Sequence, residues 1–90
     1  MLRASHGKRF EKDFQRMSRR GKPMEKFREI AKLLEQELPL PQKHRDHKLS
    51  GEYRDHRECH IEPDWLLIYR YIGNDEIRFE RTGTHADLFE

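Results

Sequence analysis

Apolar positions in the first 38 residues repeat at helical spacing, and they predict two helices after a short strand. Residues 2 to 5 suit a strand. Phe10, Phe14 and Met17 then share one face of a first helix, which Gly21 and Pro23 end. A second helical face precedes the prolines at positions 39 and 41, and it comprises Met24, Phe27, Ile30, Ala31, Leu34 and Leu38. Because Leu38 precedes a proline, an extended conformation is favoured at that residue.

From position 44 the apolar residues alternate with a period of two, which is typical of strands. Strands are predicted over residues 57 to 62, 65 to 72 and 76 to 83. The middle strand is apolar on both faces and is expected to be central. A basic loop at residues 39 to 46 joins the two halves, and residues 84 to 90 form a short tail. The prediction is an α+β fold, with a small antiparallel β-sheet meander and two N-terminal helices packed on one face.

Composition limits the chain to one domain over residues 1 to 90, with a thin core. Of the 90 residues, 33% are hydrophobic and 40% are charged, and the mean hydropathy is -1.19. No apolar run approaches the length of a membrane span, so no membrane partner is expected. The single cysteine, Cys59, excludes an internal disulfide and fits a reducing cytoplasm. We therefore expect a cytoplasmic protein.

Positive charge is concentrated in the first part of the chain. Residues 1 to 23 carry eight basic and two acidic side chains, whereas residues 61 to 90 carry three and seven. A second basic stretch precedes the predicted strand at residues 57 to 62. Such patches favour a phosphate-rich partner, although solvated charge alone also explains them. The basic residues concerned are Arg16, Arg19, Arg20, Lys22, Lys43, Arg45, Lys48, Arg54 and Arg57.

Three histidines and one aspartate surround the predicted strands: His47, His60, Asp64 and His85. Histidine gives or takes a proton near neutral pH, since its ordinary pKa is about 6.5. RNA supplies its own nucleophile in the 2′-hydroxyl, so a base, an acid and cations suffice to cleave it. The leading hypothesis is a small ribonuclease that needs no metal or other cofactor and leaves a 2′,3′-cyclic phosphate.

A zinc site is the alternative suggested by the spacings of His44 with His47 and of His56 with His60. Four residues of extended chain separate His56 and His60 by roughly 13 Å, which is too far for a shared ion unless the strand bulges. Cys59 is expected on the opposite strand face from His60. The metal hypothesis is therefore the weaker one.

Two segments of the sequence resemble one protein family. The run DHKLSGEYRDHRECHIEPDWLLIYRY and the later RFERTGTHADLF closely resemble the YafQ branch of the RelE-like toxins of bacterial type II toxin-antitoxin systems. The resemblance is most specific over residues 46 to 89. It implies a ribosome-dependent endoribonuclease that cleaves mRNA in the decoding site, with ribosomal RNA contacted through the basic surface. It also implies an inhibitory antitoxin partner, through which any DNA contact is indirect.

The family's functional positions fall on His47, His60, Asp64, Trp65, His85 and Phe89. By this resemblance His85 is the general acid, Asp64 or His60 the base, and His47 a residue that orients or stabilises the phosphate. Trp65 and Phe89 are expected to stack on a base or shape its path. From charge alone, the phosphate contacts are predicted at Arg54, Arg57, Arg78 and Arg81.

Each of these residues also has an ordinary structural interpretation. Trp65 begins a buried strand, where a core position is expected. Asp64 follows a proline, as residues in turns often do. Phe89 near the end of the chain can simply cap the core. A toxin fold retained as a noncatalytic binding module in an antitoxin and DNA repressor complex would not need the histidines. The joint occurrence of the residues favours catalysis.

Overall fold

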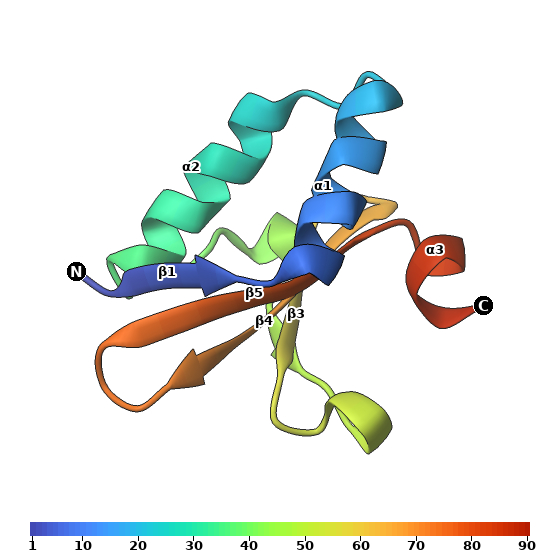
Figure 1. Cartoon of the computed structure of the whole chain (residues 1–90). Coiled ribbons are helices and arrows are strands. Elements are labelled where there is room, and N and C mark those ends of the chain that lie inside the picture. The colour runs from blue at the N-terminus through green and yellow to red at the C-terminus, as the bar shows by residue number, and fades with distance from the viewer.

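A five-stranded sheet with two helices on one face and a short helix at its end forms the computed structural model, which describes residues 1–90 (Figure 1). The expected α+β class and the placement of two N-terminal helices are confirmed. No helix has the length and apolar character needed to cross a bilayer. In chain order the elements are β1 (Arg3–His6), α1 (Lys8–Arg19), α2 (Met24–Glu35), η1 (Gln42–His44), β2 (His47–Lys48), η2 (Gly51–Tyr53), β3 (Arg57–Glu62), β4 (Trp65–Ile72), β5 (Glu76–Gly83) and α3 (His85–Phe89).

Strands β3 to β5 form the antiparallel meander that the period-two pattern predicts, and the two-residue strand β2, which was not predicted, extends it; the strand order is β1-β5-β4-β3-β2. The first strand adds one feature: β1 pairs with β5 in parallel, with Arg3 opposite Glu76 and His6 opposite Phe79. The sheet is therefore mostly antiparallel with one parallel edge. A bulge between His60 and Glu62 shifts the β3–β4 register just before the turn, where bulges commonly re-aim side chains.

The core lies between the helices and one face of the sheet. Phe10 and Met17 of α1, with Phe27, Ile30 and Leu34 of α2, are buried there as their spacing predicts. They form one cluster with sheet side chains that include Trp65, Leu67, Tyr69, Ile77 and Phe79. This packing supplies the hydrophobic stabilisation of the fold.

The opposite face of the sheet carries a second, smaller apolar cluster. Leu66 and Ile68 of β4 are fully buried beneath Leu88 of α3, with Leu49 and Tyr53 packed against them. This cover explains why β4 is apolar on both faces. The central position expected for that strand is confirmed.

Two boundaries differ from the sequence-based expectation. Helix α2 ends at Glu35, because the amides of Glu37 and Leu38 turn back to Leu34 and Leu33 and Glu37 takes a positive φ of 57°. Leu38 is 48% exposed and does not extend the apolar face. The tail is also not irregular, since it forms α3 with a capping box. The Thr84 hydroxyl accepts the Asp87 amide, and the Asp87 carboxylate accepts the Thr84 amide.

A buried ion pair joins α1 to β5. Arg81 donates from Nε and Nη2 to the two carboxylate oxygens of Asp13, at 2.6 and 3.2 Å, and the amide of Thr82 also donates to Asp13. Both charged side chains are more than nine-tenths buried. Such a pair is costly to form and more costly to break, because one partner alone would be a buried, uncompensated charge.

Replacing Asp13 tests this contact. Asp13→Ala leaves Arg81 and the Thr82 amide without their acceptor, and we expect the free energy of unfolding to fall by about 3 to 5 kcal/mol. Asp75→Ala is the control, since Asp75 forms an exposed pair with Arg3 and its loss should cost less than about 1 kcal/mol. Urea denaturation followed by circular dichroism measures both. Equal losses in the two variants would contradict the role given to Asp13.

Candidate active site

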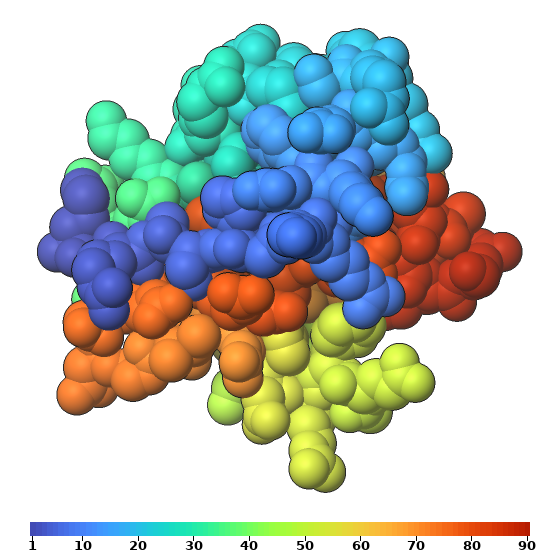
Figure 2. All heavy atoms as spheres, in the orientation of Figure 1, coloured from blue at the N-terminus to red at the C-terminus, as the bar shows by residue number.

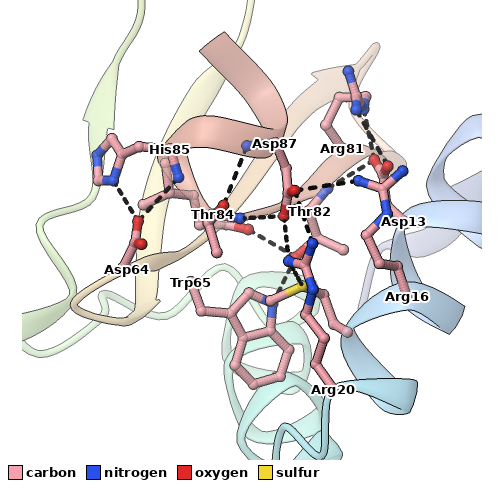
Figure 3. A network of polar contacts seen from close by, with 12 residues as sticks. Asp13, Arg16, Arg20, Asp64, Trp65, Arg81, Thr82, Thr84, His85 and Asp87 are labelled. Atoms are coloured by element: carbon pink, nitrogen blue, oxygen red, sulfur yellow. Dashed lines mark hydrogen bonds and ion pairs between the residues drawn. The ribbon is translucent and has the colours of Figure 1, made fainter. Parts of the chain in front are cut away.

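Asp64 and His85 meet where β5 passes into α3. The Asp64 Oδ1 atom accepts the backbone amide of His85 at 3.0 Å and lies 2.7 Å from Nδ1 of the same residue (Figure 3). Both side chains are more than half exposed. The backbone bond first, and then the imidazole bond, lower the pKa of the Asp64 carboxyl. An ionised Asp64 therefore orients the His85 ring toward solvent.

His60 faces this pair from the end of β3, with its ring centroid 5.7 Å from that of His85. Its Nδ1 donates to the carbonyl of Pro63 at 3.2 Å, within the turn that carries Asp64. His47 is held in the same way, because its Nδ1 donates to the carbonyl of Arg45 at 2.6 Å. Carbonyl and ionised carboxylate oxygens only accept, so all three imidazoles carry a proton on Nδ1. The Nε2 atom of each is left for proton transfer.

Glu58 connects two of these histidines. Its carboxylate is almost wholly buried on the same strand face as His60, and Oε1 lies 3.6 Å from Nε2 of His60 and 3.5 Å from Nε2 of His47. The residue was not among the candidates from sequence. Its signal was present in the period-two pattern, which puts residues 58 and 60 on one face. This buried carboxylate therefore faces the Nε2 atoms of both imidazoles.

The segment before β2 is fixed by a second carboxylate. Asp46 accepts the hydroxyl of Tyr69 at 2.6 Å and Nε of Arg57 at 3.1 Å. Burial, followed by this carboxylate, raises the pKa of the Tyr69 hydroxyl. Because Asp46 immediately precedes His47, these bonds place the His47 backbone beside Glu58, its partner in the β2–β3 ladder.

Comparison with known proteins decides the family. The model of the bacterial toxin of type II toxin-antitoxin systems, YafQ, matches residues 2–90. This chain belongs to the YafQ family of toxins. The mRNA interferase toxin YafQ of Escherichia coli K12 is 44% identical over 81 residues, which cover 89% of this chain and 87% of that protein.

Solved structures agree with this assignment. The E. coli toxin in the DinJ–YafQ complex superposes with a TM-score of 0.90 at 40% identity, covering 100% of both chains. A metal-bound toxin from Helicobacter pylori gives 0.92 at 34% identity, covering 99% of this chain and 100% of the other. The fold and the family expected from the sequence are confirmed.

The structure brings His47, His60, Asp64 and His85 of this YafQ-family toxin to one end of the sheet. The RNA contacts expected at Trp65 and Arg81, however, are wrong. Trp65 is 0% exposed, and its indole nitrogen donates to the hydroxyl of Thr82 at 2.9 Å, so it has no free face on which a base can stack. Arg81 forms its ion pair with Asp13 inside the protein and cannot reach a phosphate.

The remaining candidates lie at the surface to different degrees. Phe89 is 49% exposed, with its ring 6.5 Å from that of His85. Arg54 is exposed. Arg57 and Arg78 are about a third exposed and pair with Asp46 and Glu80. Phosphate contacts by these arginines stay predictions.

No three His, Cys, Asp or Glu side chains stand together in a way that could hold a metal ion. Cys59 is fully buried on the core face, and burial raises the pKa of its thiol. The spacing that suggested zinc does not produce a coordinating cluster.

Helix α3, which begins with His85, is held against α1 by Asp87. The carboxylate accepts two bonds from Arg20, at 2.6 and 3.1 Å, and lies 3.5 Å from Arg16 (Figure 3). The Arg20 guanidinium is the main cause of a pKa of Asp87 far below its usual range. This ion pair therefore contributes stability above the ordinary carboxyl pKa of about 3.9 and loses it as the pH falls through the lower native pKa.

Replacing Arg20 tests this contact. In the wild type we expect the free energy of unfolding to fall below about pH 5, because the Asp87 carboxyl takes up a proton in the unfolded chain at a higher pH than in the folded protein. In Arg20→Gln the fall should be smaller, because the pKa of Asp87 returns toward its ordinary value. Arg19→Gln, which removes an exposed arginine from the same turn, is the matched control. Urea titrations at each pH measure the effect, and identical slopes in all three proteins would disprove it.

Proposed function

We propose that the protein is an endoribonuclease that cleaves mRNA on the ribosome by acid/base catalysis, without a metal. The observation that carries the proposal is the contact of Asp64 with His85, facing His60 at 5.7 Å between rings. It is supported by membership of the YafQ family, whose E. coli relative is an mRNA interferase. A carboxylate and two imidazoles at one exposed corner are suited to moving two protons in one reaction.

In this proposal His60 is the base and His85 the acid. Nε2 of His60 removes the proton of the ribose 2′-hydroxyl, whose oxygen attacks the adjacent phosphorus. The bond from phosphorus to the 5′-oxygen breaks, and that oxygen takes the proton from Nε2 of protonated His85. The products are a 2′,3′-cyclic phosphate and a 5′-hydroxyl. Asp64 then orients His85 and stabilises its charge, since its Oδ1 atom is already engaged there.

His47 and Glu58 complete the site. A protonated His47 donates from Nε2 to a phosphate oxygen as negative charge develops there. Glu58, within 4 Å of both His47 and His60, compensates the charge of each imidazolium. This role accounts for a carboxylate that is nearly buried beside the surface where RNA would bind.

The ribosome and an antitoxin are the proposed partners. The four candidate side chains lie at an exposed end of the sheet, and the ribosome would present mRNA to them, as the family resemblance implies. The E. coli relative has been crystallised with the antitoxin DinJ, and a cognate antitoxin would inhibit this toxin and provide its only link to DNA. With these partners, the proposed activity belongs to the bacterial cytoplasm.

Substitution of His85 tests the catalytic assignment. His85→Gln removes the proton donor while keeping a side chain of similar length, and we expect the cleavage rate on translating ribosomes to fall by roughly 10²- to 10⁴-fold. His6→Gln is the control, since His6 lies on edge strand β1. Primer extension on the mRNA and detection of the cyclic phosphate measure the result. Unchanged cleavage in His85→Gln and Asp64→Asn would favour a noncatalytic binding module instead.

Glu58→Gln tests the carboxylate that the sequence did not single out. The substitution keeps the shape of the side chain but removes the charge facing His47 and His60, and we expect a loss of about 10- to 100-fold in the cleavage rate. Glu25→Gln, on the exposed side of α2, should cleave at the wild-type rate. If both variants cleave equally, Glu58 is only a structural residue.

A further inference from the structure

Five aromatic and imidazole rings form a row across the face of the sheet that carries the active site. In order they are His60, His85, Phe89, Tyr53 and His56, with consecutive ring centroids 5.7, 6.5, 6.3 and 5.4 Å apart. The first two belong to the candidate site. The last two come from η2 and the segment after it, so the row leads away from the reacting groups toward the protruding β2–β3 connection (Figure 1).

The row ends at a cationic notch. Strand β4 continues past the start of β3, because Arg57 stands opposite Tyr69 and the residues after Tyr69 have no partner in β3. The opening has a volume of about 280 Å³, and in Figure 2 a gap separates the yellow-green segment from the orange end of β4 and β5. We call it the cationic notch; its lining residues are Lys48, Arg54, Asp55, His56, Arg57, Arg70 and Tyr71.

Positive charge in the cationic notch is only partly compensated. Lys48 and Arg54 form no ion pair, and Asp55 is the one acidic residue in the lining. Arg57 and Arg70 are already paired. Asp46 binds Arg57, and the Glu80 carboxylate lies 3.7 Å from Nε of Arg70, an atom that is buried without a hydrogen bond. The unpaired Lys48 ammonium and Arg54 guanidinium suit a phosphate oxygen.

We propose that a single-stranded segment of the RNA substrate passes from His60 and His85 over Phe89 and Tyr53 and places its backbone phosphates in the cationic notch. The proposal rests on the proposed function. Aromatic faces accept any base, and a positive groove follows the backbone, which is the usual combination in proteins that bind single strands. Along β3, Arg57 and His60 are roughly 10 Å apart, so a few nucleotides beyond the cleaved bond span the row.

Charge removal in the cationic notch is the first test. We use uncleavable 2′-O-methyl RNA of two and of eight nucleotides and measure binding by fluorescence anisotropy at several salt concentrations. Lys48→Gln with Arg54→Gln should weaken binding of the octanucleotide and reduce its salt slope by about 0.7 for each phosphate that is no longer neutralised. Binding of the dinucleotide, whose one linking phosphate lies at the candidate site, should not change. Arg28→Gln with Lys32→Gln, on the exposed side of α2, is the control for net charge.

Tyr53 is the second test, designed to separate stacking from packing. Tyr53→Leu keeps apolar bulk over Leu66 and Ile68 but removes the ring, and it should weaken octanucleotide binding by about five- to a hundredfold. Tyr53→Trp keeps an aromatic face and should bind as the wild type does. Thermal unfolding of both variants confirms that each is folded at the assay temperature.

The outcomes separate this proposal from the catalytic one. If the notch and Tyr53→Leu variants bind the octanucleotide like the wild type, the RNA path is wrong, even where His85→Gln abolishes cleavage. If the notch variants lose binding only to ribosomes that carry no mRNA, the cationic notch contacts ribosomal RNA, and the proposed RNA path is also wrong. Losses confined to the octanucleotide support the path.

Discussion

The candidate active site depends on how α1 holds the corner between β5 and α3. One side of this helix supplies Phe10 and Met17 to the core, while its polar residues reach the end of the sheet: Asp13 accepts from Arg81 and Thr82, and Arg20 donates to Asp87. Between these attachments the chain turns into α3 and presents His85. A five-residue helix has almost no stability of its own, so tertiary contacts must fix the position of that imidazole.

Orientation of the imidazoles follows from the acceptors around them. Two backbone carbonyls and one carboxylate each accept a hydrogen bond from Nδ1 of a different histidine. This arrangement selects one tautomer without demanding a particular protonation state at the other nitrogen. The rings can therefore exchange protons at Nε2 while their positions stay fixed, a form of preorganisation that general acids and bases require.

Most of the fold could be predicted from the sequence, because strong periodicity marks α1, α2 and the long strands. The site could be named residue by residue but not assembled, since the contact of Asp64 with His85 joins residues 21 positions apart through a sheet register that no pattern reveals. Arg81 was misjudged because its partner Asp13 lies 68 positions away. Trp65 was misjudged because resemblance identifies a functional position without showing whether the side chain acts at the surface or beneath it. The end of α2 was misplaced because an apolar residue at helical spacing does not prove that the helix reaches it.

Tyr69 shows that the hydrophobic interior and the reactive surface are not separate parts of this toxin. Its ring lies in the core, and its hydroxyl holds the carboxylate of Asp46, next to His47. A substitution such as Tyr69→Phe would leave the interior filled and yet release the backbone beside an imidazole. Screens that select only for thermal stability would accept such a change, so libraries that repack this interior need a selection for toxicity as well.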